Sequence, residues 1–394
     1  MKTSVIITIL LISISACNSQ INLANIQNIR PNNDSIEIIN INRILKEEKF
    51  ELAPIIKEIK LVKLETTAES ILKDYGDILV TNDYIYITDN YKGQGLSIFQ
   101  KNGQFVKRVP NGLGPGELYS NFEIAYNYEK NELVVSQSPS KIFFYTPEGS
   151  FKYEIDINIS IASFISHNNE YFAYIEPGVI GKDLLKKFKN NIFFVLDSNF
   201  TILKTALSEK RQVPYYDSPY ITKTDDKIYF THQLCDTIYQ YSEKLLQVKY
   251  VFIYDDKLQI NPKQLDYRNV DFFIETLIRN NDKYWFGGGY FANKDNHVFL
   301  LNKVTSSYSI YQDKKTKHLI GGLIPQINSQ PIYALSKVLS SYNDYYIYVL
   351  QSSENSDIKN LIESNMIDDI DKKKLLENNE EDNPILIFVK YKSF

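Results

Sequence analysis

A short motif recurs along this chain of 394 residues and limits the folds that it can adopt. Each copy begins with a polar turn and continues into alternating aromatic and β-branched residues, as in NDYIYITDN from Asn82 to Asn90. Such alternation is typical of a β-strand. The copies are 38 to 61 residues apart and begin at Asp83, Asn131, Asn169, Asp226, Asp282 and Asn343. Self-similarity at this period indicates a repeat architecture.

Each copy is surrounded by further strand-like segments. A second apolar stretch follows every copy, such as LSIFQ from Leu96. After five of these stretches a tight turn leads into another strand, as KNG leads into QFVKRV, and one strand precedes each copy. The unit is therefore a four-stranded antiparallel meander, which is the blade of a propeller. The sequence predicts an all-β, six-bladed β-propeller with four-stranded antiparallel blades.

The last repeat lacks a fourth strand, because ILIFVKYKSF reaches the end of the sequence. An open strand edge at that point would favour aggregation. One strand-like segment, PIIKEIKLVKLE, remains unassigned before the first repeat. We therefore expect the ring to be closed by pairing of an N-terminal strand (residues 54–65) with a C-terminal strand (residues 385–392).

The N-terminus has the pattern of an export signal. MKTSVIITILLISISACNSQ has a positive start and an apolar run that is too short to span a bilayer. Its Ile-Ser-Ala-Cys segment, ending at Cys17, resembles the bacterial lipobox, although an ordinary cleaved signal with a chance Cys is the alternative. We expect a lipoprotein signal peptide (residues 1–16), lipidation of Cys17, a flexible tether (residues 17–45) and one propeller domain (residues 46–394). The lipid would attach the protein to a membrane.

Two longer segments carry a resemblance to a known family. NGQFVKRVPNGLGPGEL (102–118) resembles the first-blade hairpin and Gly-Pro-Gly-Glu turn of the six-bladed β-propeller lipoproteins of the Bacteroides group, relatives of NHL-type propellers. DTIYQYSEKLLQVKYVF (236–252) is similar to their fourth-blade segment. The resemblance covers about residues 45–394. It implies the fold and a bacterial cell envelope location, and hardly any chemistry. No acidic residue follows Cys17 closely, which favours a periplasm-facing protein over a surface-exposed one.

Loop lengths indicate where a ligand would bind. The turns between first and second strands and between third and fourth strands are short, and in a propeller both lie on one face. The longer segments belong to the opposite, loop-rich face, where binding is expected. Within the last of them, residues 351–384, apolar residues recur at helical spacing and predict a helical insert. The candidate binding residues are Gly114, Gly116, Glu117, Lys186, Lys187 and Ile362.

The sequence gives little support for catalysis. It contains neither a Gly-x-Ser-x-Gly elbow nor a phosphate-binding loop with its Lys, and Cys235 has no nucleophile signature. The sole Trp, Trp285, lies beside three glycines, and we expect core packing there rather than an aromatic shelf for a sugar. The net charge of −4 excludes a basic field for nucleic acid. The four histidines are scattered and favour packing over a metal site; they are His167, His232, His297 and His318.

Two functional hypotheses follow. The first is a lipid-anchored, monomeric propeller that binds a protein, peptide or glycan through its loop-rich face, with neither a cofactor nor a catalytic residue. The second is an enzyme, a lyase or hydrolase, whose site in the central channel uses a metal or carboxylates from several blades. A propeller brings residues from different blades to one axis, so linear spacing does not exclude the second hypothesis.

Overall fold

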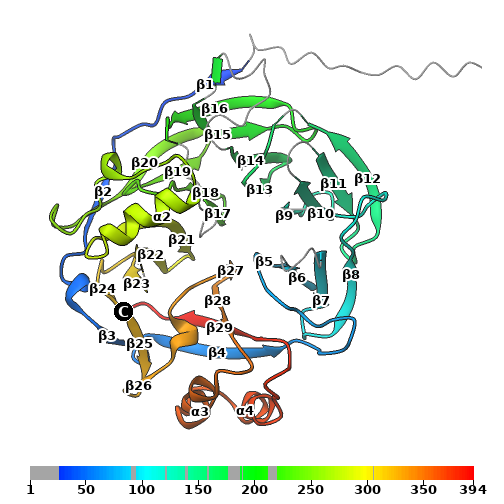
Figure 1. Ribbon diagram of the computed structural model, residues 1–394, viewed down its shortest axis with the longest axis vertical. Coiled ribbons are helices and arrows are strands. Elements are labelled where there is room, and N and C mark those ends of the chain that lie inside the picture. The colour runs from blue at the N-terminus through cyan, green and yellow to red at the C-terminus, as the bar shows by residue number, and fades with distance from the viewer. Residues whose placement is uncertain are drawn as a thin grey trace, which may run out of the picture.

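The computed structural model shows a ring of β-sheets around a central axis (Figure 1). The predicted signal peptide, Cys17 and Lys186 lie outside the described residues. Within the described part of the chain, no helix is long and apolar enough to cross a membrane. The structure describes residues 26–89, 95–119, 122–137, 141–157, 159–175, 187–188, 190–211, 220–304 and 306–394.

The first three sheets around the ring follow the chain in simple order. Sheet 1 consists of β5 (Ile78–Val80), β6 (Tyr84–Asp89), β7 (Gly95–Gln100) and β8 (Phe105–Val109). Sheet 2 consists of β9 (Phe122–Asn127), β10 (Glu132–Gln137), β11 (Lys141–Tyr145) and β12 (Phe151–Asp156). Sheet 3 consists of β13 (Ser163–His167), β14 (Glu170–Tyr174), β15 (Asn191–Leu196) and β16 (Ile202–Ser208), with β1 (Gln27–Asn28) added outside β16.

The next three sheets complete the circle around the axis. Sheet 4 consists of β17 (Ile221–Thr224), β18 (Lys227–Phe230), β19 (Thr237–Ser242) and β20 (Leu245–Ile253), with β2 (Glu37–Asn40) outside β20. Sheet 5 consists of β21 (Trp285–Ala292), β22 (Asn296–Lys303), β23 (Ser306–Asp313) and β24 (Leu319–Gly322). Sheet 6 consists of β27 (Ser340–Tyr342), β28 (Tyr345–Leu350), β29 (Ile385–Tyr391) and β4 (Ile56–Lys63).

The described residues form seven sheets, so the predicted number of six was wrong. Sheet 7 consists of β25 (Ile324–Ile327), β26 (Gln330–Pro331) and β3 (Lys49–Glu51). It forms because residues after β24 pair in parallel with β3 from the N-terminal region, with Pro325 opposite Phe50. Neither segment is predicted as a strand from the sequence. Each of sheets 1 to 6 has at least four strands, as expected.

The fifth repeat also differs from the expectation, by one strand. Asp282 follows the helix α2 (Val270–Arg279), and β21 after it is the innermost strand of sheet 5 rather than the second. The hairpin turn of this sheet lies at Asn293, whose side-chain oxygen accepts hydrogen bonds from the backbone N–H groups of Asp295 and Asn296, both at 2.9 Å. Asn293 therefore fills the role that the repeat pattern predicts for Asp282, because its side chain can hold a turn.

The predicted seam between the two ends of the chain is confirmed. β29 pairs antiparallel with β4, with Phe388 opposite Lys60 and Ile387 opposite Leu61. Both Ile387 and Leu61 are buried in the core between sheets 5 and 6. Alternate residues of these strands point into that core because side chains alternate across a strand.

The described part of the predicted tether, residues 26–45, is not a free linker. It runs along the outer rim of the ring, where β1 pairs in parallel with β16 and β2 with β20 (Figure 1). It continues into a 3₁₀ helix, η2 (Ile44–Lys46), in which Ile44 and Leu45 are buried. The prediction failed because a polar, Asn-rich composition does not show that alternate Ile residues are buried by pairing with a distant strand.

The expected helical insert contains two helices, α3 (Asn355–Glu363) and α4 (Asp369–Leu376). Figure 1 shows both outside β4 at the rim of the ring. The Asp371 carboxylate of α4 accepts a hydrogen bond from the Leu61 N–H of β4 at 2.8 Å. The insert therefore covers an outer strand and is not a free element on the loop-rich face.

Candidate functional site

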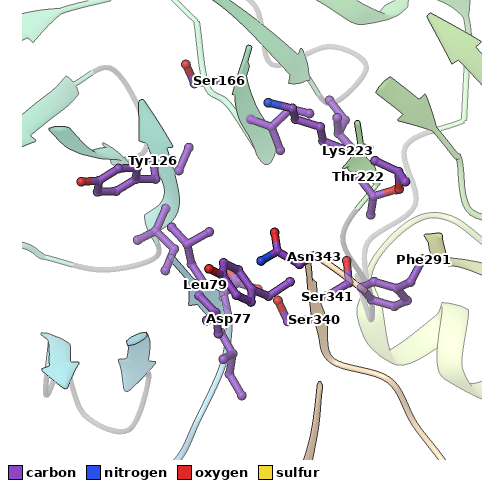
Figure 2. A pocket seen from close by; sticks show the side chains of 18 of the residues that line it. Asp77, Leu79, Tyr126, Ser166, Thr222, Lys223, Phe291, Ser340, Ser341 and Asn343 are labelled. Carbon is purple, nitrogen blue, oxygen red and sulfur yellow. The ribbon is translucent and has the colours of Figure 1, made fainter. Parts of the chain in front are cut away.

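A cavity of about 650 Å³ lies on the axis of the ring. Its lining comes from the innermost strands of sheets 1 to 6, which are β5, β9, β13, β17, β21 and β27 (Figure 2). Each of these strands is the inner edge of its sheet, so residues far apart in sequence meet around one space. Sheet 7 contributes no residue to this lining.

The cavity reaches the face that carries the short turns. Its lining includes residues of five turns between first and second strands, namely Asn82, Tyr128, Asp225, Lys294 and Asn343. The loop lengths in the sequence instead predict binding on the opposite, loop-rich face. Turns of this kind need residues that tolerate a left-handed backbone, and Asp225 and Asn343 adopt φ values of 52° and 52°. Because such residues are common in turns, nothing in the sequence showed that they would lie at the cavity mouth.

A row of tyrosine rings leads from sheet 1 to the cavity. Tyr84 and Tyr86 have ring centroids 6.2 Å apart, Tyr86 and Tyr126 are 6.0 Å apart, and Tyr126 and Tyr128 are 5.0 Å apart. Tyr128 at the end of this row is 49% exposed. Burial of its hydroxyl among protein atoms raises the pKa of Tyr128 to about 12, so the phenol stays neutral at physiological pH. The row ends in an accessible aromatic surface with a neutral hydroxyl group.

A second aromatic group lies in the mouth on β27. The Tyr342 hydroxyl donates to the Asn82 side-chain oxygen at 2.6 Å. The Lys101 ammonium lies 3.4 Å from the centroid of the Tyr342 ring, a cation–π contact that holds the ring in place. Burial lowers the pKa of Lys101 to about 8. Lys223 of β17 also lines the cavity, and burial lowers its pKa below the usual range.

Two carboxyl groups from neighbouring sheets face the same cavity. Asp77 precedes β5 and Glu123 lies on β9. Asp77 is accessible to solvent within the cavity, but protein surrounds it, and this desolvation raises its pKa while a hydrogen bond with Glu123 partly lowers it. A carboxyl group with a raised pKa beside another carboxyl group is an arrangement that can hold and transfer a proton.

A second hollow, of about 540 Å³, lies against sheet 2 on the outside of the ring. Its lining includes the predicted binding residues Gly114 and Glu117. The Glu117 carboxylate accepts a hydrogen bond from the Gly114 N–H at 2.9 Å, and a Cβ at Gly114 would lie within 3.0 Å of that carboxyl group. Gly116 has a φ of 71°, and a Cβ there would meet the Phe151 ring at 2.5 Å. These residues shape the loop that forms one wall of the hollow, which we call the rim groove.

The remaining predicted residues lie elsewhere. Ile362 of α3 is half-buried against the core under the insert, and Lys187 is exposed with its ammonium 5.1 Å from the Phe188 ring centroid. Trp285 is buried and packs with α2, as expected. Its neighbouring glycines form the β-bulge of β21, where Gly288 has a φ of 98°.

The histidines and Cys235 do not gather into a site. His232 and His297 are buried, and burial lowers their pKa values to about 4 and about 3. Cys235 and His232 are joined by a turn in which the Cys235 N–H donates to the His232 carbonyl at 3.3 Å. Among the residues that the structure describes, no group of three or more His, Cys, Asp or Glu side chains is arranged to hold a metal ion.

Comparison with known proteins gives the family. The family model of a domain of unknown function, DUF4934, matches residues 36–390. The chain belongs to the DUF4934 family. The match begins at residue 36, so β2 and η2 of the rim segment lie within the DUF4934 domain and β1 lies before it. The comparisons give no support for an NHL-type family, and the lipid anchor on Cys17 stays a prediction.

Two solved structures share the fold of this DUF4934 chain. A Bacteroides fragilis protein predicted to be exported has a TM-score of 0.69 at 20% identity, covering 91% of this chain and 100% of that chain. A member of the DUF4221 family from Bacteroides vulgatus has a TM-score of 0.50 at 12% identity, covering 86% and 97%. No curated protein matches the sequence. At these identities the likeness establishes the propeller fold alone.

Proposed function

We propose that this protein is an exported binding module that takes a polar ligand, a peptide or a glycan, into the axial cavity from the short-turn face. The observation that carries the proposal is the cavity itself. Its volume of about 650 Å³ lies in the range of roughly 300–1,000 Å³ that is usual for ligand sites. This differs from the sequence-based hypothesis in the face that is used, because the cavity mouth is ringed by short turns.

The lining has the chemistry to bind such a ligand. Tyr128 and Tyr342 present rings on which an apolar face of a sugar or a side chain can pack, since aromatic rings combine an apolar body with a polar hydroxyl. The Asn343 amide and the Ser341 hydroxyl can donate and accept hydrogen bonds from the same wall (Figure 2). A mixed aromatic and hydroxyl lining suits a neutral, hydroxyl-rich or amide-rich ligand.

The proposed location is the bacterial cell envelope, with a lipid on Cys17 and the ring facing the periplasm. The export-signal pattern at the N-terminus supports it. The similar Bacteroides fragilis protein is likewise described as one that is predicted to be exported. Mass spectrometry of the N-terminal peptide from membranes tests the anchor, because an unmodified Cys17 would contradict it.

Binding is tested with purified full-length protein and a panel of bacterial and host oligosaccharides and of short peptides. The first compound that binds is then titrated against Tyr128→Ala. Loss of the ring at the mouth should weaken binding at least tenfold. The matched control is Tyr333→Ala, because Tyr333 is 52% exposed but lies outside the cavity lining. Equal affinity of Tyr128→Ala and wild type would exclude this entry route.

An enzyme is the second candidate, and the paired carboxyl groups Asp77 and Glu123 are the observation that favours it. The raised pKa makes Asp77 a candidate proton donor, and Glu123 a candidate base, for a lyase or hydrolase reaction. The same compound panel, incubated with protein and analysed by mass spectrometry, tests this function. Turnover should disappear in Asp77→Asn and persist in Asp256→Asn, an exposed control. If the wild-type protein formed no product from any compound, the enzymatic function would be excluded and binding would remain as the proposed function.

A further inference from the structure

The six strands that line the axial cavity are each paired on one side only. In the described part of the chain, β5, β9, β13, β17, β21 and β27 are the terminal strands of their sheets. In a terminal strand, the backbone N–H and C=O groups of alternate residues point away from the neighbouring strand, which here is toward the axis. The cavity wall therefore offers backbone donors and acceptors that suit the amide groups of an extended peptide.

All six strands run in the same direction along the axis. Each one leads into a short turn at the cavity mouth, so its last residue lies near the mouth and its first residue lies at the far end. Position along a strand therefore gives depth in the cavity, at about 3.3 Å per residue. This common direction allows charged side chains from different sheets to be compared in depth.

The two carboxyl groups of the cavity lie far from its mouth. Asp77 immediately precedes β5, and Glu123 is the second residue of β9. A hydrogen bond joins their side chains. The lysines of the described lining lie instead near the mouth, and that lining contains no arginine. An ammonium group of a ligand at this depth would therefore meet carboxyl groups with no competing lysine or arginine in the lining.

A positive charge lies near the mouth. Lys223 is the last residue but one of β17, and Figure 2 shows it on the other side of the cavity from Asp77. Its ammonium lies 5.9 Å from the centroid of the Tyr128 ring. The other lysine of the lining, Lys294, forms an ion pair with Asp344 at 3.5 Å. Lys223 is therefore the lysine that can bind an anionic group of a ligand.

The surroundings of Lys223 leave room for a further negative charge. Burial lowers the pKa of Lys223, and the attraction of Glu129 and Asp226 only partly offsets this effect. A carboxylate of a ligand would favour the charged form of the lysine. Asp225 also lines the mouth, where it attracts Lys314. The mouth therefore favours an anionic group at Lys223.

The spacing between the two charged ends matches a short peptide. Glu123 lies four residues before the end of β9, whereas Lys223 lies one residue before the end of β17. Measured from the strand ends, the two positions therefore differ in depth by three residues, or about 10 Å. Three extended residues of a peptide span about the same length. A neutral oligosaccharide has neither an ammonium nor a carboxylate to place at these ends.

We propose that the axial cavity binds a peptide of about three residues with free termini, its ammonium at Asp77 and Glu123 and its carboxylate at Lys223. This inference rests on the proposed function, because it specifies the ligand of the same cavity. The inner strand edges bond the peptide amides, and a side chain packs on Tyr128 at the mouth. Such a ligand has no net charge and is rich in amide groups.

The first experiment needs no variant. Purified full-length protein is equilibrated with a library of tripeptides that have free termini, and the retained peptides are identified by mass spectrometry. The tightest-binding tripeptide is then prepared with an acetylated amino terminus or an amidated carboxyl terminus, and each form is titrated by calorimetry. We expect each blocked form to bind at least tenfold more weakly than the free peptide, because each lacks one of the two charges.

Two variants locate the two ends of the peptide. Glu123→Gln should weaken binding of the free peptide at least tenfold and change binding of the acetylated form by no more than about twofold. Lys223→Gln should have the same effects on the free and the amidated forms. Lys227→Gln is the matched control, because Lys227 is exposed on the next strand and lies outside the cavity lining. Thermal unfolding verifies that the variants are folded.

Three results would overturn the inference. The first is equal affinity of the free and the blocked peptides for the wild type. The second is an unchanged affinity of the free peptide in both Glu123→Gln and Lys223→Gln. The third is the absence of binding by any tripeptide. If oligosaccharides then bind, and bind more weakly to Tyr128→Ala, the proposed binding function stands and only this inference fails. If neither class of compound binds, both fail.

Discussion

The outer strands of sheets 6 and 2, β4 and β12, occupy equivalent places but have opposite surroundings. On β4, Ile59 and Leu61 are 5% and 1% exposed, because their side chains point into the core between sheets 5 and 6, and α4 covers the outer edge of the strand. On β12, Phe151 and Tyr153 are about 40% exposed. The comparison teaches that strand formation and strand burial have separate causes. The first depends on local alternation, and the second on which distant segment packs against the edge.

The largest expected difference between these strands is in stability. Leu61→Ala should lower the free energy of unfolding by about 3 kcal/mol, because it removes a buried side chain from the seam. Tyr153→Ala should cost only about 1 kcal/mol, mainly from loss of its stacking on Phe144 at 4.3 Å. Urea unfolding measures both. Equal losses of unfolding free energy would show that β4 and β12 do not differ in their contribution to stability.

The cover on β4 can be removed without touching the strand. Asp371→Ala leaves the buried Leu61 N–H without its acceptor, and should cost about 2 kcal/mol. Hydrogen exchange at the Leu61 amide should accelerate. Lys373→Ala, at an exposed position of the same helix, is the control and should change neither quantity. If Leu61 stayed protected in Asp371→Ala, α4 would not be the cover.

The C-terminal end of the seam should be sensitive to acid. Burial alone would raise the pKa of Asp313, but hydrogen bonds from Ser393, Thr316 and Phe394 hold it at about 2. Because this pKa lies below the value of 3.8 for an unperturbed Asp, its stabilisation is present above pH 3.8 and is lost as the pH falls toward 2. Asp313→Asn should cost about 1 kcal/mol at pH 6 and flatten the fall in Tm between pH 4 and 2. An unchanged acid profile would contradict this role.

The smallest effect is expected on β12 itself, which pairs only with β11 among the described residues. Glu154 forms an ion pair with Lys141, and the two side chains are 35% and 33% exposed. Since surface ion pairs contribute little, Glu154→Ala should change the unfolding free energy by less than about 0.5 kcal/mol. A loss above about 1 kcal/mol, measured by urea unfolding, would indicate that β12 is held by more than the described contacts.

Much of the ring was predictable from the sequence, but the candidate sites were not. Asn131 and Asn343 mark hairpin turns in the sequence, and both adopt a positive φ in the structure. Asp282 misled the repeat assignment, because a polar pair after a helix looks like a polar pair in a hairpin. Tyr128 follows a strand in an ordinary Tyr-Asn-Tyr alternation. Nothing local distinguishes it from a turn residue on an outer surface.

The sequence by itself determined most strands of the ring, most of their turns and the closing seam, because alternation and turn residues act between neighbours in the chain. Only the tertiary structure decided the axial cavity and the covers of the outer edges. The cavity joins the inner edges of six sheets, and Glu37 pairs with Tyr250 from the far half of the chain. Contacts over such separations depend on how the sheets are arranged in space, and a residue's own neighbours in sequence carry no record of that arrangement.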